Sequence, residues 1–177
     1  TGIRQFGAEL MKRSFKGQIH LILTHYHWDH IQGWPFFTPT YIPNREFVVY
    51  GRAASSDKLR SIFGSQMHGP FFPVEFKKLA PHFEVVPLKE GLLKIGSLNI
   101  QTIEQCHPGG AFGLRITENR QAFVFMTDHE AGLTDKLPHP YGDYVKFARK
   151  ADLLVHDAQF SEEELPKYKT WGHSSYE

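Results

Sequence analysis

Apolar residues follow two patterns along the chain, one typical of helices and one typical of strands. Apolar positions three and four apart, with polar residues on the opposite face, predict amphipathic helices. Short, nearly continuous apolar runs that end at polar or turn residues predict strands. The predicted helices cover residues 1–13, 53–63 and 143–150, with a short helical turn over 162–165. The predicted strands cover residues 19–23, 47–50, 83–86, 92–95, 98–103, 111–117, 122–127 and 152–156.

The strands fall into two kinds. Those at 19–23 and 152–156 are nearly continuous apolar runs, which are typical of strands buried on both faces. From residue 83 onward, the other strands are short and are separated by turn sequences such as Gly96-Ser97 and Glu118-Asn119-Arg120. This rhythm predicts successive hairpins, so the chain is expected to be an α/β protein with a largely antiparallel section of sheet.

Length and composition describe one globular domain. The chain has 177 residues, of which 41% are hydrophobic and 22% are charged, as in ordinary globular proteins. We therefore expect a single domain over residues 1–177. The longest apolar runs fall far short of the roughly 20 residues that cross a bilayer, so a membrane is not an expected partner.

The net charge bears on nucleic acid as a partner, and the cysteine content bears on the cellular location. The formal net charge is +1, which provides no broad basic field for holding a long nucleic acid, so nucleic acid is not the favoured partner. The single cysteine, Cys106, cannot form an internal disulfide, and the first residues do not resemble a secretory leader. We expect a cytoplasmic location; the sequence does not determine the oligomeric state.

The strongest chemical signal is the segment Thr24-His25-Tyr26-His27-Trp28-Asp29-His30, directly after the strand at 19–23. Imidazole and carboxylate groups are ligands that suit zinc or a similar ion. In an extended segment, residues two apart face the same way, so His25 and His27 can bind one ion together. Asp29 and His30, where the loop turns into a helix, indicate a second ion.

This segment resembles the His-Xaa-His-Xaa-Asp-His signature of the metallo-β-lactamase superfamily. Two later motifs, Cys106-His107-Pro108-Gly109-Gly110 and Met126-Thr127-Asp128, each follow a predicted strand in the superfamily's order. The resemblance implies an α/β fold, the four-layer αβ/βα sandwich. It further implies one ion bound by His25, His27 and His107, and a second bound by Asp29 and His30, with Asp128 linking both. Taken singly, His107 also suits a turn, and Asp128 a turn or helix cap.

Two further motifs resemble a pair found in RNA-processing and phosphodiesterase members of the superfamily. Residues 153–160 carry His156-Asp157-Ala158 where those members usually have His-Glu-Ala, and Gly172-His173-Ser174-Ser175 stands for Gly-His-Ser-Thr. The resemblance implies that His173, oriented by Asp157, donates a proton during catalysis, together with a catalytic role for Asp29. Because Asp157 is one methylene shorter than Glu, its hydrogen bond to His173 is the point to check. In the alternative interpretation, Asp157 ends a strand and His173 caps the C-terminal segment.

The resemblance implies a hydrolase with two divalent metal ions, zinc in the first place, with manganese or iron as alternatives. His27 disfavours the di-iron electron-transfer members, which have Glu there, and His30 disfavours the true β-lactamases. The favoured reaction is attack of a metal-bridging hydroxide on a phosphodiester bond of a small (cyclic) nucleotide or related diester. The alternatives are an RNA 3′-processing endonuclease and a non-catalytic, metal-stabilised binding domain.

Two expectations concern the surroundings of the site. Aromatic residues in the segments 33–43 and 66–73 suit either a pocket for a small diester substrate or core packing. The resemblance also implies that the first strands of the fold and its last helix and strand, with one more histidine for the second ion, lie outside residues 1–177. In the alternative interpretation, the second metal site is incomplete.

Overall fold

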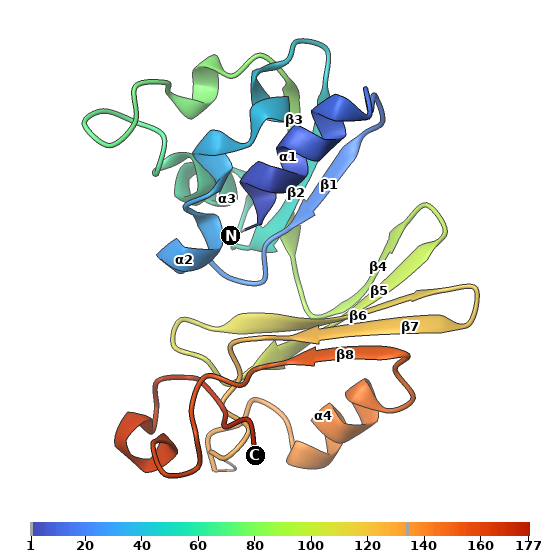
Figure 1. Cartoon of the computed structure of the whole chain (residues 1–177), viewed down its shortest axis with the longest axis vertical. Coiled ribbons are helices and arrows are strands. Elements are labelled where there is room, and N and C mark those ends of the chain that lie inside the picture. The colour runs from blue at the N-terminus through green and yellow to red at the C-terminus, as the bar shows by residue number, and fades with distance from the viewer. Residues whose placement is uncertain (1, 134) are drawn as a thin grey trace. The chain divides into compact units, whose positions relative to one another are not determined.

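The computed structural model describes residues 2–133 and 135–177, which divide into two compact units with the boundary after Leu88 (Figure 1). Each unit contains one β-sheet with its own helices. None of the helices among the described residues is long and apolar enough to cross a membrane.

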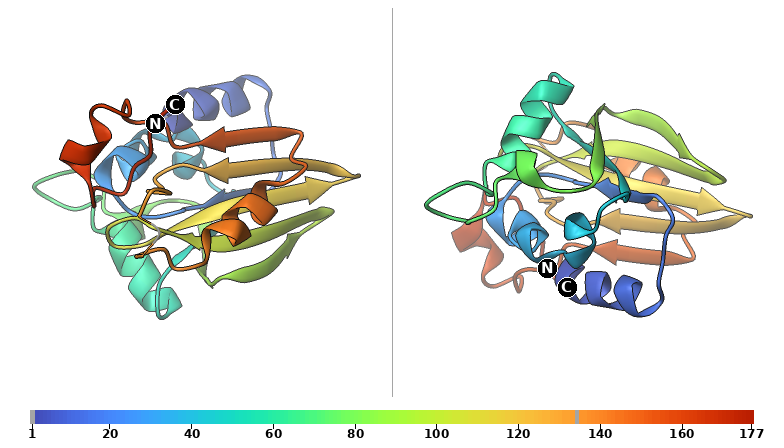
Figure 2. Two further views of the ribbon diagram at one scale, coloured as in Figure 1. Left: turned by 90° about the horizontal axis from the view of Figure 1, so that it is seen from below. Right: turned by 90° about the horizontal axis from the view of Figure 1, so that it is seen from above.

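The first unit is built on a three-stranded parallel sheet in the order β1-β2-β3 (Figure 2). The ladder aligns Ile19 with Phe47 and Phe47 with Phe83, so parallel neighbours share a register over their whole length. The elements of this unit are α1 (Ile3–Lys12), β1 (Ile19–Ile22), α2 (Trp28–Ile31), η1 (Trp34–Phe36), η2 (Thr38–Tyr41), β2 (Glu46–Arg52), α3 (Ser56–Gly64), η3 (Phe76–Lys78) and β3 (His82–Leu88).

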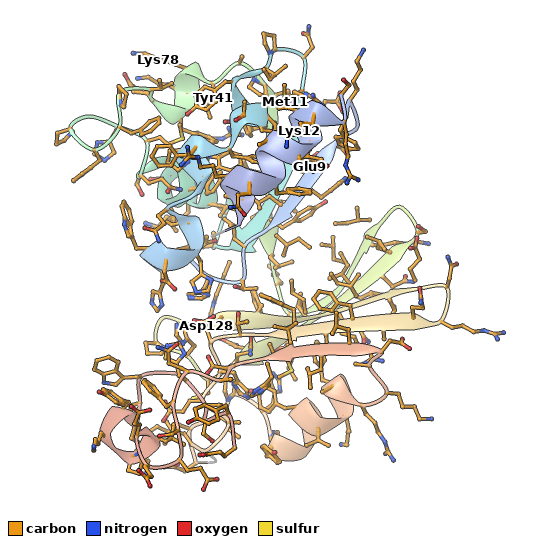
Figure 3. All side chains as sticks on the ribbon, viewed as in Figure 1. Glu9, Met11, Lys12, Tyr41, Lys78 and Asp128 are labelled. Atoms are coloured by element: carbon orange, nitrogen blue, oxygen red, sulfur yellow. The ribbon has the colours of Figure 1, made fainter. Side chains whose placement is uncertain are left out.

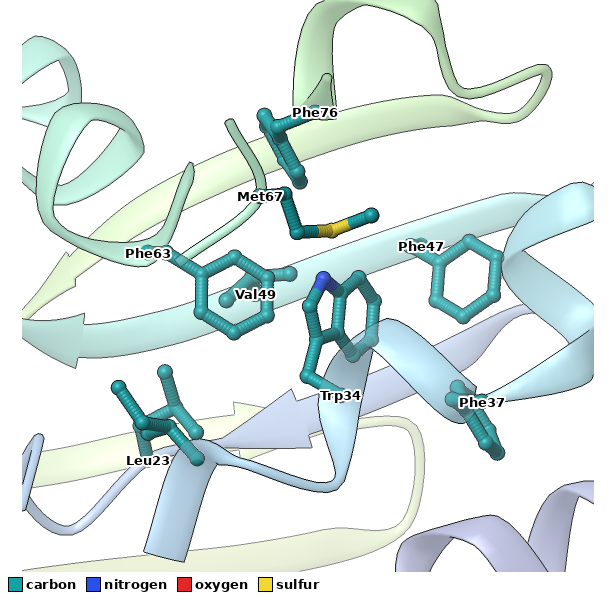
Figure 4. Close-up of a cluster of buried hydrophobic side chains, with 9 residues drawn as sticks. Leu23, Trp34, Phe37, Phe47, Val49, Phe63, Met67 and Phe76 are labelled. Carbon is teal, nitrogen blue, oxygen red and sulfur yellow. The ribbon is translucent and has the colours of Figure 1, made fainter. Parts of the chain in front are cut away.

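Trp34 forms the centre of the first unit's core. Its indole is 2% exposed, and its ring centroid lies 4.5 Å from that of Phe63 and 5.8 Å from that of Phe37 (Figure 4). Leu23 and Ile31, on either side of the histidine-rich segment, belong to the same cluster of buried residues. This packing fixes both ends of the segment, because each end is anchored by a buried apolar side chain.

The second unit is built on a five-stranded sheet in the order β4-β5-β6-β7-β8. The first four strands pair antiparallel as hairpins, and β7 and β8 pair in parallel. Both central residues of the β6–β7 turn, Asn119 and Arg120, have positive φ, which matches the right-handed twist of a two-residue hairpin. The elements of this unit are β4 (Gly91–Ile95), β5 (Leu98–Gln105), β6 (Ala111–Glu118), β7 (Gln121–Met126), α4 (Tyr141–Ala148), β8 (Leu153–His156) and η4 (Leu165–Tyr168).

Helix α4 lies in the connection between the parallel strands β7 and β8 and packs on the sheet. Val124 and Met126, two residues apart on β7, form a buried cluster with Ile103 of β5 and Tyr144 of α4. The period of two places both β7 side chains on the face that α4 covers. The Tyr144 hydroxyl donates a hydrogen bond to the Glu104 carbonyl at 2.7 Å, which ties the helix to the end of β5.

The direction of the strands brings three chemically active segments to one edge of this sheet. Strand β5 is antiparallel to β6, which is antiparallel to β7, and β7 is parallel to β8, so β5, β7 and β8 run the same way. Their carboxyl ends therefore meet at the same edge. His107 follows β5, Asp128 follows β7 (Figure 3), and Asp157 follows β8.

The structure has a helix or strand at each predicted position, with shifted boundaries. It differs from the prediction in the pairing of one strand and in the burial of two others. The strand at 83–86 is β3, which pairs in parallel with β2 and does not open the hairpin series. The strands at 19–23 and 152–156 are not buried on both faces: His20 is exposed on β1, and Leu153 and Leu154 are 57% and 47% exposed on β8. Both strands also lie at an edge of their sheet, which apolar composition alone does not reveal.

Candidate metal centre

In the first unit, His25 and His27 of the loop between β1 and α2 gather with His30 of α2. The ring centroid of His25 lies 4.7 Å from that of His27 and 4.2 Å from that of His30. His25 is 3% exposed, whereas His27 is exposed and the His30 side chain is partly exposed. Asp29 lies beside them, with its Oδ2 atom 3.0 Å from His30 Nε2. Close-packed imidazoles with an adjacent carboxylate form a donor set suited to zinc.

Tyr26, between the first two histidines, anchors this loop to the end of β2. Its hydroxyl donates a hydrogen bond to the Arg52 carbonyl at 2.7 Å, and burial raises the pKa of the phenol well above its usual value. A Cβ atom at Gly51 would lie 2.6 Å from the Tyr26 oxygen, so only glycine leaves room for the ring. The anchored tyrosine turns inward while its neighbours His25 and His27 turn toward each other.

In the second unit, the segments after β5 and β7 meet the C-terminal loop. His107, Asp128 and His173 each offer one nitrogen or oxygen atom, and these atoms lie within 4.8 Å of one another. We call these three residues the carboxyl-edge cluster. Two imidazoles and a carboxylate at this separation could hold a metal ion. Asp128 has a φ of 61°, a left-handed conformation that aspartate tolerates better than most residues.

Asp157 is the buried hydrogen-bond acceptor behind this cluster. Its Oδ2 atom accepts from the Asp128 N–H at 2.9 Å and lies 2.7 Å from His173 Nδ1. Its Oδ1 atom accepts from the N–H groups of Gln159 and Ser174 at 3.3 and 2.8 Å. The predicted contact between Asp157 and His173 is therefore present despite the shorter side chain. A carboxylate accepts only, so His173 carries a proton on Nδ1, and its neutral form presents the Nε2 lone pair elsewhere.

His107 is oriented by the backbone of the C-terminal loop. Its Nδ1 atom lies 3.0 Å from the Gly172 carbonyl oxygen. A carbonyl also accepts only, so this contact places the His107 proton on Nδ1 and leaves the Nε2 lone pair for a ligand role. Both imidazoles of the cluster are thus held in the same tautomer.

Two further groups beside the cluster are held in neutral form. Burial lowers the pKa of His129 to about 4, and its Nδ1 atom accepts the Cys106 N–H at 3.2 Å. Burial, with the Glu130 charge adding to it, raises the pKa of the Cys106 thiol. The thiol form is a poor nucleophile and metal ligand, in agreement with a site built on histidine and aspartate.

The structure therefore groups the predicted ligands by unit: His25, His27, Asp29 and His30 in the first, and His107 and Asp128 in the second. It also adds to the role considered for His173. Sequence analysis assigns this residue to proton donation, but its position with His107 and Asp128 suits a metal ligand as well. Sequence reasoning missed this because the distance in sequence between residues 107, 128 and 173 hides their common edge of the sheet.

The aromatic residues considered for a substrate pocket divide between core and surface. Trp34 and Phe37 are 2% exposed and belong to the core. Phe36 and Phe71 are 55% and 71% exposed, and Phe72 packs edge-on against Phe36. Core packing thus accounts for the first pair, and only the second pair is accessible to a ligand.

Gly172→Ala is expected to lower the free energy of unfolding by more than the unfavourable backbone conformation of an alanine at this position would by itself. Gly172 has a φ of 86°, and a Cβ atom there would lie 2.2 Å from His107 Nδ1 and 2.4 Å from Pro108 Cδ. We expect the positive φ to cost about 1–2 kcal/mol, with the displacement of His107 adding to it. Equilibrium unfolding in urea and zinc affinity measure the two effects.

Gly109→Ala is the matched control, because Gly109 has a φ of 79° but no atom within 4 Å of an added Cβ. It should show the conformational cost and nearly unchanged zinc affinity. Equal losses of stability and of zinc affinity in the two variants would contradict the proposed close approach of Gly172 to His107.

The sequence matches a known protein family. The family model described as "Beta-lactamase superfamily domain" matches residues 5–177. No curated protein matches the sequence at a significant level.

Three solved structures share the fold at low sequence identity. The metallo-β-lactamase fold protein YhfI from Bacillus subtilis is 18% identical with a TM-score of 0.60, and the match covers 88% of this chain and 55% of YhfI. The short form of human tRNase Z is 20% identical with a TM-score of 0.64, and the match covers 89% of this chain and 64% of that protein. Unliganded yeast PDE1 is 14% identical with a TM-score of 0.67, and the match covers 91% of this chain and 49% of PDE1. The chain thus spans between about half and two thirds of the length of these proteins.

Proposed function

The chain belongs to the metallo-β-lactamase superfamily, and from this premise we propose that it is a binuclear metal-dependent hydrolase of phosphodiester bonds in small (cyclic) nucleotides or related diesters. The observation that carries the proposal is the carboxyl-edge cluster, in which His107, Asp128 and His173 bring their ligand atoms within 4.8 Å. Two imidazoles and a carboxylate are a donor set that zinc and similar ions take.

The superfamily signature assigns the ligands to two ions. His25, His27 and His107 would bind the first, and Asp29 and His30 would bind the second, with Asp128 shared by both. We propose that His173 completes the second set. With its Nδ1–H directed at Asp157, the neutral form of His173 has a lone pair at Nε2 that can bind a metal.

Two bound divalent ions would generate a hydroxide at neutral pH and neutralise the charge that develops on the phosphoryl oxygens. The chain's own residues prepare the site. Asp157 and the Gly172 carbonyl fix the tautomers of His173 and His107. The Asp29 side chain is 72% exposed, so its carboxylate is accessible to a proton released during the reaction.

The choice of phosphodiesters rests on the motifs at 153–160 and 172–175. Asp157, the Asp of the first motif, accepts hydrogen bonds from His173 and Ser174 of the second motif, so the two motifs are directly connected. The similar solved structures support the fold and do not by themselves identify a substrate. The near-neutral charge favours a small diester over a long polyanion.

Hydrolysis of bis-p-nitrophenyl phosphate tests the proposal. We expect turnover by the purified protein that is lost with a chelator and restored by zinc, manganese or iron. The monoester p-nitrophenyl phosphate and the ester p-nitrophenyl acetate serve as comparison substrates, and both should react more slowly. Absence of metal-dependent turnover of the diester, or a clear preference for the carboxylic ester, would remove the phosphodiesterase assignment.

An RNA 3′-processing endonuclease is the second candidate, favoured by the Gly-His-Ser motif at 172–174. Such an enzyme should cleave a structured RNA with a steep dependence on salt concentration, because it must neutralise several phosphates. Rapid, salt-sensitive RNA cleavage together with weak hydrolysis of small diesters would favour this candidate over the first.

A further inference from the structure

We infer that Glu130 is a positioning residue for the metal centre: it holds the turn at residues 170–172 so that the Gly172 carbonyl sets the tautomer of His107. The inference rests on the proposed function, since it concerns a histidine proposed as a metal ligand. Glu130 does not belong to the carboxyl-edge cluster, and it acts on His107 through the backbone.

Glu130 is a buried carboxylate, 3% exposed, whose two oxygens are both used for the turn. Oε1 accepts the Thr170 N–H at 2.8 Å, and Oε2 accepts the Gly172 N–H at 2.8 Å. The Glu130 N–H donates to the Cys106 carbonyl at 2.9 Å. One residue therefore connects the segment that carries His107 to the loop that approaches it.

The turn that Glu130 holds is conformationally costly. Thr170 is exposed and has a φ of 75°, which is unusual for a β-branched residue. Such a conformation persists only where surrounding contacts fix it. The hydrogen bond from the Thr170 N–H to Glu130 is one such contact, and the charge of the acceptor makes it a strong one.

The result of this conformation is the position of the Gly172 carbonyl. Its oxygen lies 3.0 Å from His107 Nδ1, while the N–H of the same residue is bound to Glu130. Loss of the Glu130 contacts would let the turn relax and withdraw the carbonyl. The neutral imidazole of His107 could then carry its proton on Nε2, the atom required for metal binding.

His173 provides an internal reference, because its tautomer depends on another group. Asp157 holds His173 Nδ1, and Ser174 is tied to the backbone of His129 and Ala131. Loss of the Glu130 carboxylate should therefore change His107 and leave His173 unchanged. General damage to the fold would affect both histidines.

Glu130→Gln tests the inference, because glutamine keeps the size of the side chain but directs an NH₂ group at one of the two N–H donors. Long-range ¹H–¹⁵N correlation spectra of metal-free protein at pH 8, where histidines are neutral, report the tautomer of each histidine. In the wild type, we expect His107 and His173 to carry the proton on Nδ1. In Glu130→Gln, His107 should shift toward the Nε2–H form, and cobalt affinity should fall about tenfold or more, as for other residues that orient a ligand.

Two companion variants separate positioning from general stability. Glu90→Gln changes a carboxylate of the same unit that accepts the Glu104 N–H and contacts His139, and it should leave the His107 tautomer unchanged. Thr170→Gly removes the conformational cost of the turn, so in combination with Glu130→Gln it should partly restore the Nδ1–H form of His107.

A lower melting temperature of Glu130→Gln without a change at His107 would overturn the inference, as would equal changes at His107 and His173. These outcomes are distinct from a failure of the proposed function. If wild-type protein bound no cobalt, the metal centre would be wrong, whereas the tautomers of metal-free protein would still report whether Glu130 positions His107.

Discussion

Asp128→Ala is expected to reduce kcat/KM for bis-p-nitrophenyl phosphate by about a thousandfold or more and to lower the bound metal below two ions per chain. Asp128 is proposed to be the one ligand common to both ions, so its removal affects both. Metal-ion catalysis supplies several kcal/mol of transition-state stabilisation, and each 1.36 kcal/mol corresponds to about tenfold in rate. Steady-state kinetics and elemental analysis of the same preparation measure the two effects.

Asp143→Ala is the control for this prediction. Asp143 forms an exposed ion pair with Lys146 on α4, and such pairs contribute little to stability. The variant should keep full activity and metal content. If Asp128→Ala retained more than a tenth of the wild-type activity with two bound ions, Asp128 would not be a shared ligand.

Asp157→Asn is expected to weaken metal binding about 10–100-fold and to lower the free energy of unfolding of the metal-free protein by about 2–3 kcal/mol. Four donors converge on the two oxygens of Asp157, from Asp128, Gln159, His173 and Ser174. In either orientation, an asparagine would direct its NH₂ group at two of these donors. Competition with a chromophoric zinc chelator and urea unfolding measure the two losses.

Two further variants test whether the loss of metal affinity comes from the Asp157 carboxylate. Asp157→Glu keeps both acceptors and restores the residue usual in the related motif, so it should bind metal better than Asp157→Asn. Asp152→Asn changes a carboxylate just before β8 that accepts the Ala122 N–H at 2.7 Å, and it should leave metal affinity unchanged. Equal metal affinity in wild type and Asp157→Asn would show that the carboxylate does not support the ligands.

The positions of the proposed ligands His25, His107 and Asp128 could be predicted from sequence because each lies shortly after a strand. A histidine or aspartate just past an apolar run, as at His25, His107 and Asp128, lies where a strand ends and a loop begins. Local pattern and motif order were sufficient for these positions. They were also sufficient for the helices and strands, whose apolar spacing depends on near neighbours in sequence.

The supporting roles of Glu130 and Gly172 could not be predicted because they depend on long-range pairing. Glu130 binds a turn 40 residues later in the chain, and Gly172 approaches a histidine 65 residues earlier. The metal-ligand role proposed for His173 depends on long-range pairing as well, because the common direction of β5, β7 and β8 brings His107, Asp128 and Asp157 to one edge of the sheet. Strand pairing likewise decided that β3 joins the parallel sheet rather than a hairpin.

The most direct test of the binuclear centre is titration of metal-free protein with zinc, following diester hydrolysis and bound metal in the same samples. We expect activity to rise with metal occupancy and to reach its maximum at two ions per chain, and we expect His173→Ala to bind one ion less. A single tightly held ion with no hydrolysis at any occupancy would contradict it and would indicate a metal-stabilised binding domain.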